Sequence, residues 1–288
     1  MAIPSNRIPI LTLLVLALIP AIACAADADA ALQITWKDDW LTLRGPALGS
    51  SEIRVHYLEA YCRPGSTARD WKQTVIPHKA KLLSATPDAR RIILQDTLAD
   101  GVTVRHLITA GTDEVTFVLT ATNPTTQPSQ AAWAQPCVRV GPFTGHTDAA
   151  GTDYLPNCFL FLDGKLTRFP TPHWSTTALY TPGQVWCPKD VSRDDVNPRP
   201  LSPDVPSNGL IGCFSADNKT IFATAWQPYQ ELFQGVASCL HSDLRIAGLR
   251  PGETKTIRGK IYVVPNDLGK LLERYKTDFP EQVVRPRQ

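Results

Sequence analysis

The 288-residue sequence lacks the short signatures of several common enzyme classes. It contains no Gly-x-Ser-x-Gly elbow, no Walker loop, no Gly-x-Gly-x-x-Gly motif and no His-Glu-x-x-His motif. It also lacks a Cys-x-x-Cys pair and any block of basic residues, and its formal charge is only +2. Nucleic acid is therefore not an expected partner, because binding to phosphates needs a dense basic surface. No cofactor and no metal site are expected from these patterns.

Long apolar runs are confined to the N-terminus, where Ile8–Ile22 follows Arg7. This run is shorter than the about 20 residues of a membrane span, and small residues follow it, which is typical of an export signal. We expect residues 1–23 to be a signal peptide and the protein to be periplasmic, outer-envelope or extracellular in a bacterium. The stretch that ends at Cys24 also approximates a lipobox, so a lipid anchor at Cys24 remains an alternative to simple secretion.

Cysteine is sparse, and six cysteines remain after Cys24: Cys62, Cys137, Cys158, Cys187, Cys213 and Cys239. An even number in an exported chain is compatible with disulfides. A domain of this size does not need them, however, and free cysteine packs well as a small apolar residue. Both readings stay open at this point.

Alternation of apolar and polar residues predicts strands through most of the chain. In Val102–Thr109 the alternation puts His106 on the apolar face, which indicates a core histidine with satisfied hydrogen bonds. Asp163-Gly164 is a pair suited to a tight hairpin turn. Strands are expected at Gln33–Trp36, Leu41–Arg44, Glu52–Tyr61, Lys81–Ser84, Arg91–Asp96, Val102–Thr109, Glu114–Thr122, Trp133–Val140, Phe159–Leu162, Lys165–Phe169, Ile221–Gln227, Leu232–His241 and Lys255–Val264.

Two segments depart from this strand pattern. Asp267–Lys276 has apolar residues at helical spacing, with a capping residue in front, and is the one convincing helix. Within Gly141–Gly209, the part Gly141–Asn157 is rich in Gly, Thr and Asp, and the part Thr181–Gly209 is rich in Pro, which excludes a central strand in that last part. Its large aromatic residues favour packing, so we expect an insertion at about 141–209 folded over one face of a single domain spanning 30–288.

Two segments resemble galactose mutarotase-like domains. The first is the order of strands around the turn Leu249–Glu253, and the second is the strand Phe117–Asn123, which runs through a Pro-containing turn into the next strand. The resemblance implies an all-β fold, a large two-sheet antiparallel β-supersandwich with one C-terminal helix, and a carbohydrate partner. At the position of the family's general acid, a histidine, this chain has Gln135, and His241 lies near the position of the general base, a glutamate.

The resemblance and the residue chemistry together name the candidate site. His241, with Asp243 and Glu231, is the candidate acid and base set, since proton transfer suits imidazole and carboxylate groups. Aromatic faces and bidentate polar groups suit sugar binding, and the candidates are Arg63, Asp70, Trp71, Trp133, Gln135, Trp226 and Gln227. The expected function is carbohydrate binding or processing, with an epimerase or lyase as the enzymatic form. The alternative is a non-catalytic structural or interaction protein of the cell envelope, and the sequence leaves the choice open.

Overall fold

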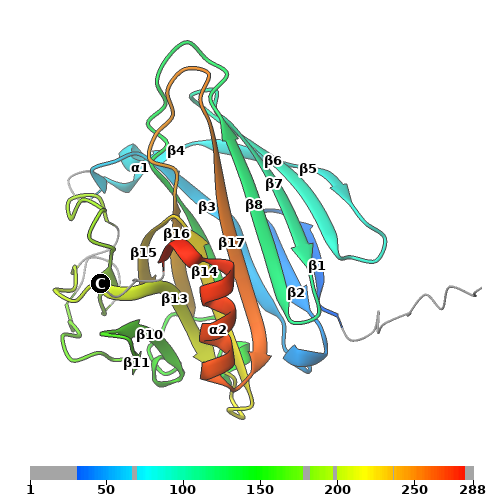
Figure 1. Ribbon diagram of the computed structural model, residues 1–288, viewed down its shortest axis with the longest axis vertical. Helices are drawn as coiled ribbons and strands as arrows, with labels where there is room; N and C mark the ends of the chain where they lie inside the picture. The colour runs from blue at the N-terminus through cyan, green and yellow to red at the C-terminus, as the bar shows by residue number, and fades with distance from the viewer. Residues whose placement is uncertain (1–30, 67–69, 178–181, 197–199, 236, 283–288) are drawn as a thin grey trace, which may run out of the picture.

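Two antiparallel sheets dominate the computed structural model, which describes residues 31–66, 70–177, 182–196, 200–235 and 237–282 (Figure 1). The signal peptide and Cys24 expected from the sequence lie outside the described residues. In spatial order, sheet A contains β1 (Gln33–Lys37), β2 (Trp40–Arg44), β3 (Ile53–Cys62), β9 (Trp133–Arg139), β16 (Cys239–Arg245), β15 (Tyr229–Gln234) and β12 (Val185–Trp186), with β4 (Val75–Ile76) paired to β3.

Sheet B packs against sheet A across a shared core. Its spatial order is β11 (Lys165–Arg168), β10 (Cys158–Leu162), β13 (Pro206–Phe214), β14 (Thr220–Gln227), β17 (Thr254–Pro265), β8 (Glu114–Thr122), β7 (Thr103–Ala110), β6 (Arg91–Leu98) and β5 (His78–Ala85). Short 3-10 turns lie at Pro46–Leu48, Pro142–Thr144, Leu155–Asn157 and Pro280–Gln282. The all-β, two-sheet fold with one C-terminal helix is thus confirmed.

The apolar alternation in the sequence explains why these strands form a two-layer structure. Along β7 and β8 every second residue is buried, and the buried set faces the other sheet. The β10–β11 hairpin turns at Asp163 and Gly164, which have φ angles of 49° and 73°. Both are the positive angles that a tight type I′ turn requires.

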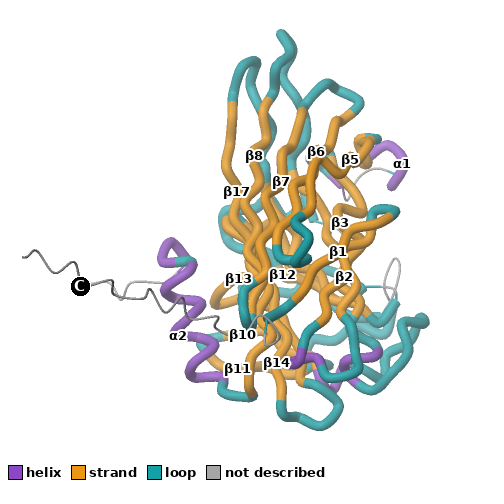
Figure 2. The backbone as a smooth tube through the Cα atoms, turned by 90° about the vertical axis from the view of Figure 1, so that its right-hand side faces the viewer, coloured by secondary structure: helices purple, strands orange, loops and turns teal. Residues whose placement is uncertain are grey.

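The helix α2 (Leu268–Asp278) covers the outer face of sheet B (Figures 1 and 2). It begins where predicted, since the Asp267 side chain accepts a hydrogen bond from the backbone N–H of Lys270 at 3.1 Å. Its apolar side buries Leu271 and Tyr275 against the aromatic residues of β10 and β17. A four-residue helix, α1 (Trp71–Thr74), was not expected from the sequence. No helix of the described residues is long and apolar enough to cross a membrane.

One strand prediction near the C-terminus was wrong, and one strand was missed. Leu232–His241, expected as one strand, belongs to the two strands β15 and β16, and a hairpin joins them after Gly235. The backbone N–H of Gly235 donates to the carbonyl of Cys239 at 3.0 Å, which closes the turn. The strand β13 was missed: it begins at Pro206, inside the Pro-rich segment in which no central strand was expected, and it lies between β10 and β14.

A buried polar network connects the two sheets in the core. Oη of Tyr57 lies 2.9 Å from Nδ1 of His106, and Nε2 of that ring lies 3.1 Å from the Asp96 carboxylate. The hydroxyl of Tyr61 donates to the same carboxylate at 2.6 Å. His106 is fully buried, so the prediction of a satisfied core histidine is confirmed.

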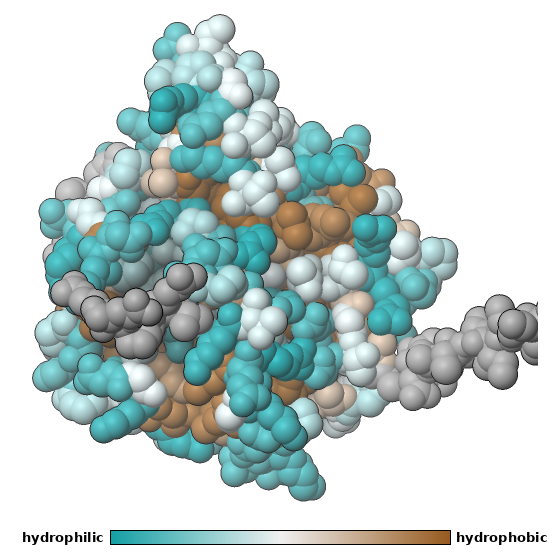
Figure 3. All heavy atoms as spheres, in the orientation of Figure 1, coloured by the Kyte–Doolittle hydropathy of each residue, from teal (hydrophilic) through white to brown (hydrophobic). Residues whose placement is uncertain are grey.

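Beside α2, sheet B has an outer face that is partly apolar. Ile93, Leu107 and Val118 are half-buried and occupy neighbouring register positions on β6, β7 and β8. Figure 3 shows apolar side chains reaching the surface among polar ones on this side of the molecule. The outer face of sheet B is therefore less polar than the water-facing side of a typical antiparallel sheet.

The core network predicts a dependence of stability on acid. Burial raises the pKa of Asp96, but the hydrogen bonds from His106 and Tyr61 outweigh it, and the net pKa is lowered. A lowered pKa in the folded state stabilises the protein above the unfolded pKa of about 3.9, and this contribution is lost as the pH falls through the folded pKa. We expect Asp96→Asn to cost about 1–3 kcal/mol at pH 7 in urea unfolding, and less below pH 4.

The control for this prediction is Asp38→Asn, because the Asp38 side chain is 83% exposed. This change should leave the free energy of unfolding within about 0.5 kcal/mol of the parent. Equal stability of Asp96→Asn and the parent protein at pH 7 would contradict the role assigned to the network.

Candidate functional site

The candidate site begins with the alternation of side chains along β16. Leu240 and Leu244 belong to the core between the sheets, so Cys239, His241 and Asp243 point to the opposite side of sheet A. Both sets are buried. The strand therefore carries an apolar face toward sheet B, and its other face carries a thiol, an imidazole and a carboxylate.

The neighbouring strands add matching groups to that side. On β9, Val138 pairs with Leu240, so Cys137 and Gln135 stand opposite His241 and Asp243. On β15, Glu231 pairs with Asp243, and Phe233 pairs with His241. We call this surface of sheet A the site face, and it consists of Gln135, Cys137, Glu231, Phe233, Cys239, His241 and Asp243.

The imidazole of His241 is in contact with groups on several sides. Its Nδ1 lies 3.3 Å from the side-chain amide of Gln135 and 3.5 Å from Oδ1 of Asp243. Its Nε2 lies 3.5 Å from Sγ of Cys239. The ring stacks on Phe233, with the centroids 4.2 Å apart and the planes 8° from parallel. These contacts fix both the position and the orientation of the ring.

Burial decides the electrostatics of the site face. Only 2% of His241 and none of Asp243 is exposed. Burial lowers the pKa of His241, yet the Cys137 sulfur and the Asp243 carboxylate outweigh it and raise that pKa overall. Burial raises the pKa of Asp243. The hydrogen bond to Cys239, together with burial, raises the pKa of the Cys137 thiol. Each group interacts strongly because little water screens it.

Residues of the insertion cover the site face. Val185, Val191 and Val196 pack with Phe233, the residue on which His241 stacks. Val185 also belongs to β12, the edge strand that the insertion adds to sheet A beside β15. Residues 185–196 thus pack beside His241, whereas β10 and β11, which also fall within 141–209, belong to sheet B.

A cavity of about 380 Å³ lies at one end of the site face. Its polar walls include Gln230 and Arg245 from sheet A, and Asp190 and Asp195 from the insertion. The β15–β16 register shifts between Tyr229 and Glu231, and this irregularity lets Gln230 reach the backbone carbonyl of Asp195 at 2.5 Å. Arg245 donates to the Asp190 carboxylate at 2.6 Å. Burial raises the pKa of Asp195.

The structure brings only some of the sequence-predicted residues together. His241, Asp243, Glu231 and Gln135 meet on the site face, although His241 does not line the cavity of about 380 Å³. Trp133 lies beside the cavity, where its indole N–H donates to Asp195 at 3.4 Å.

Two polar residues predicted to bind substrate have local structural contacts. Arg63 donates to the backbone carbonyls of Gln73 and Val75, and Asp70 caps α1 through the backbone N–H of Lys72. Trp71, in α1, packs on Trp133 with the ring centroids 6.4 Å apart. These contacts hold a loop next to the site face.

Trp226 and Gln227 are not brought to the site face. They lie on β14 of sheet B, where Trp226 is buried in the core against Phe117. Gln227 lines a second cavity of about 1030 Å³ beside α2. Trp226, Gln227 and Glu231 belong to one short run of the sequence. The chain passes from β14 of sheet B to β15 of sheet A at Pro228, so Glu231 lies in a different sheet from Trp226 and Gln227.

Sequence reasoning missed the two cysteines of the site face and the cavity residues Gln230, Arg245 and Asp195. Cys137 and Cys239 are about a hundred positions apart in the sequence, so only strand pairing shows that they meet. All six described cysteines are free thiols. The spacing Cys239-x-His241 on one strand was a readable signal, because alternation places both side chains on one face.

Comparisons with known proteins show likeness in the fold. No protein-family model and no curated protein matches the chain. Among solved structures, a galactose mutarotase-like protein from Lactobacillus casei is 9% identical, with 81% of this chain and 99% of that chain covered and a TM-score of 0.44. A candidate aldose 1-epimerase from Escherichia coli K12 is 11% identical, with 81% and 98% covered and a TM-score of 0.41.

A polysaccharide lyase is also similar, at 11% identity and a TM-score of 0.35, with 85% of this chain and 34% of that chain covered. These likenesses concern the fold alone. What the site does is inferred below from the side chains of this chain.

The packing of the insertion predicts slow hydrogen exchange. The N–H groups of Val185 and Ser202 donate to backbone carbonyls at 3.0 and 2.8 Å, and the Trp186 ring is fully buried. We expect these amides to exchange slowly in hydrogen-exchange mass spectrometry or NMR, while the exposed Gly151 exchanges fast. Fast exchange of Val185 and Ser202 would show that the insertion does not stably cover the site face.

Proposed function

We propose that the protein binds carbohydrate in the cavity at one end of the site face. The observation that carries this proposal is the set of polar groups around a space of about 380 Å³, with Gln230, Arg245 and Asp195 in its wall. This volume is within the range of small-ligand sites, about 300–1,000 Å³. Carboxylate, amide and guanidinium groups together match the donors and acceptors of sugar hydroxyls.

The position of the cavity links it to the buried acid and base groups. Every second residue of β16 points to the same side, at a spacing of about 7 Å, and His241, Asp243 and Arg245 all lie on that side. A sugar that contacts Arg245 in the cavity would therefore lie near Asp243, the next side chain on that side of the strand. Asp243 forms a pair of carboxylates with Glu231, which stands directly opposite it on β15. This pairing favours a second candidate, an enzyme that moves protons on its sugar.

The proposed place of action is outside the cytoplasm. The apolar run Ile8–Ile22 after Arg7 supports export, and the sequence ending at Cys24 supports a lipid anchor as the alternative. Polysaccharides of the cell envelope and its surroundings would be within reach of such a protein.

Arg245 provides the test of binding. Replacing Arg245 with Met removes the guanidinium donors from the cavity wall and keeps much of the side-chain length. A hydrogen bond to a charged group contributes about 1.5–3 kcal/mol, so we expect affinity to fall about 10-fold to 100-fold. The probes are D-glucose, D-galactose and their short oligosaccharides, and the measurement is isothermal titration calorimetry on the full chain.

Arg91→Met is the matched control, since Arg91 is exposed on β6 of sheet B. It should leave the affinity unchanged. If none of the sugars binds the parent protein, or if Arg245→Met binds them as tightly as the parent, the proposed binding function is wrong.

His241 provides the test of catalysis. If the protein turns over a sugar that binds in the cavity, His241→Gln should retain binding and lose turnover, because glutamine keeps the polarity but transfers no proton. His173→Gln is the control, since His173 is an exposed residue that pairs with Asp204 away from the site face. Turnover measured by NMR that persists in His241→Gln would remove His241 from the reaction.

A further inference from the structure

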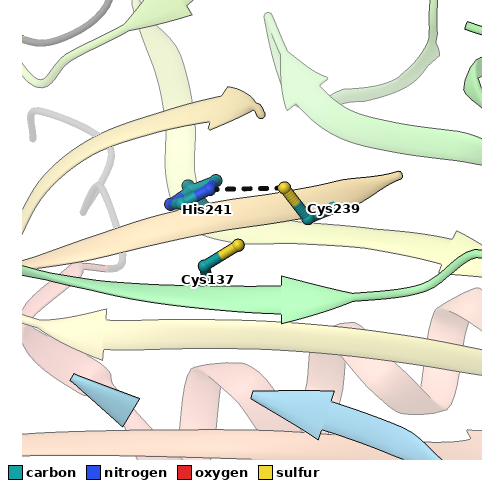
Figure 4. A group of neighbouring side chains, drawn as sticks. All are labelled: Cys137, Cys239 and His241. Atoms are coloured by element: carbon teal, nitrogen blue, oxygen red, sulfur yellow. Dashed lines mark hydrogen bonds between the residues drawn. The ribbon is translucent and has the colours of Figure 1, made fainter. Parts of the chain in front are cut away.

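Two cysteines and a histidine meet on the site face. Sγ of Cys137, Sγ of Cys239 and a ring nitrogen of His241 all lie within 4.8 Å of one another, and all three residues are buried. Figure 4 shows the Cys137 sulfur on β9 pointing toward the side where His241 and Cys239 lie on β16. The three ligand-type atoms therefore converge from two adjacent strands.

We propose that Cys137, Cys239 and His241 bind a single thiolate-preferring divalent cation of the zinc class. Two sulfurs and one imidazole nitrogen are a donor set that favours zinc over magnesium or calcium, which prefer oxygen ligands. Three protein ligands leave one position of a tetrahedral ion for a further ligand. This site is separate from the sugar cavity and does not depend on the proposed binding function.

One spacing among the ligand atoms already fits a tetrahedral ion, and the three atoms as a group lie within 4.8 Å of one another. With metal–sulfur and metal–nitrogen distances of about 2.3 and 2.0 Å, two tetrahedral ligands lie about 3.5 Å apart. Sγ of Cys239 and Nε2 of His241 are 3.5 Å apart. One edge of the coordination polyhedron thus already has the required length.

The other side of the imidazole is arranged as in known metal sites. A ligating histidine usually donates its second N–H to a carboxylate or carbonyl, which fixes its tautomer. Nδ1 of His241 lies 3.5 Å from Asp243 and 3.3 Å from the Gln135 amide. Oε1 of Gln135 has no hydrogen-bond partner among the described residues, so a half-turn of the amide would let it accept from Nδ1–H. Nε2 is then free to face the sulfurs.

Gly235 keeps open the space beside the ligand atoms. A Cβ atom at Gly235 would lie 2.3 Å from Sγ of Cys239 and 2.8 Å from Nε2 of His241. The Cβ atom of any other residue at this position would therefore clash with two of the three ligands. A variant at Gly235 can disturb the site without removing a ligand.

Cobalt is the spectroscopic probe for this site. The full chain, reduced and stripped with a chelator, should bind one equivalent of Co²⁺ with a thiolate-to-metal charge-transfer absorption that Zn²⁺ abolishes. Cys137→Ser and Cys239→Ser should lose the absorption. Cys187→Ser should keep it, because Cys187 is equally buried but lies in the insertion cluster.

A second measurement guards against loss of folding in the cysteine variants. Zn²⁺ should raise the unfolding temperature of the parent protein, because a ligand that binds only the folded state stabilises it. Gly235→Ala, which keeps all three ligands, should bind Zn²⁺ at least 10-fold more weakly and show a smaller rise.

Several results would overturn the metal site. These are no cobalt absorption in the reduced parent, absorption that survives in the Cys137→Ser, Cys239→Ser double variant, or equal stabilisation by Mg²⁺ and Zn²⁺. A Cys137–Cys239 disulfide in the isolated protein, with no metal uptake after reduction, would assign the pair to a covalent bond instead. None of these results bears on sugar affinity, which Arg245→Met tests separately.

Discussion

Coverage of both faces of β9 and β16 is the constraint on which the site depends. One face of these strands meets sheet B, the other carries the site face, and only Arg139 and Arg245, at the strand ends, are partly exposed. Buried polar groups must then satisfy one another. The imidazole of His241, with contacts to Gln135, Asp243 and Cys239, is the result of that requirement on the site face.

The two proposed sites divide the site face between them. At one end, Arg245 and Asp195 border a cavity large enough for a small sugar. At the other end, the sulfurs of Cys137 and Cys239 flank His241 in a dry environment. An ion held there would join β9 to β16 and occupy Nε2 of His241, so the metal site and an acid–base role of His241 are alternatives.

The sequence was sufficient for most of the sandwich because alternation is a local signal. It located β7 and β8 closely, the turn at Asp163 and the helix after Asp267. It failed at Leu232–His241, where apolar residues continue through a hairpin and only Gly235 marks the turn. Half of the site was foreseeable, since Glu231, His241 and Asp243 are close in the chain. On β9, Gln135 was foreseen only through the family resemblance, and Cys137 was missed, because pairing between distant strands leaves no local pattern.

The strand order has a consequence for how the chain reaches this structure. In sheet B, β8 pairs with β17, although all the strands from β9 to β16 lie between them in the chain. In sheet A, β16 must dock on β9 across the same stretch. Closing such long loops costs entropy before any contact repays it, so folding should be slow for a chain of this size. Until β17 arrives, β8 offers an unpaired edge on which other chains can add.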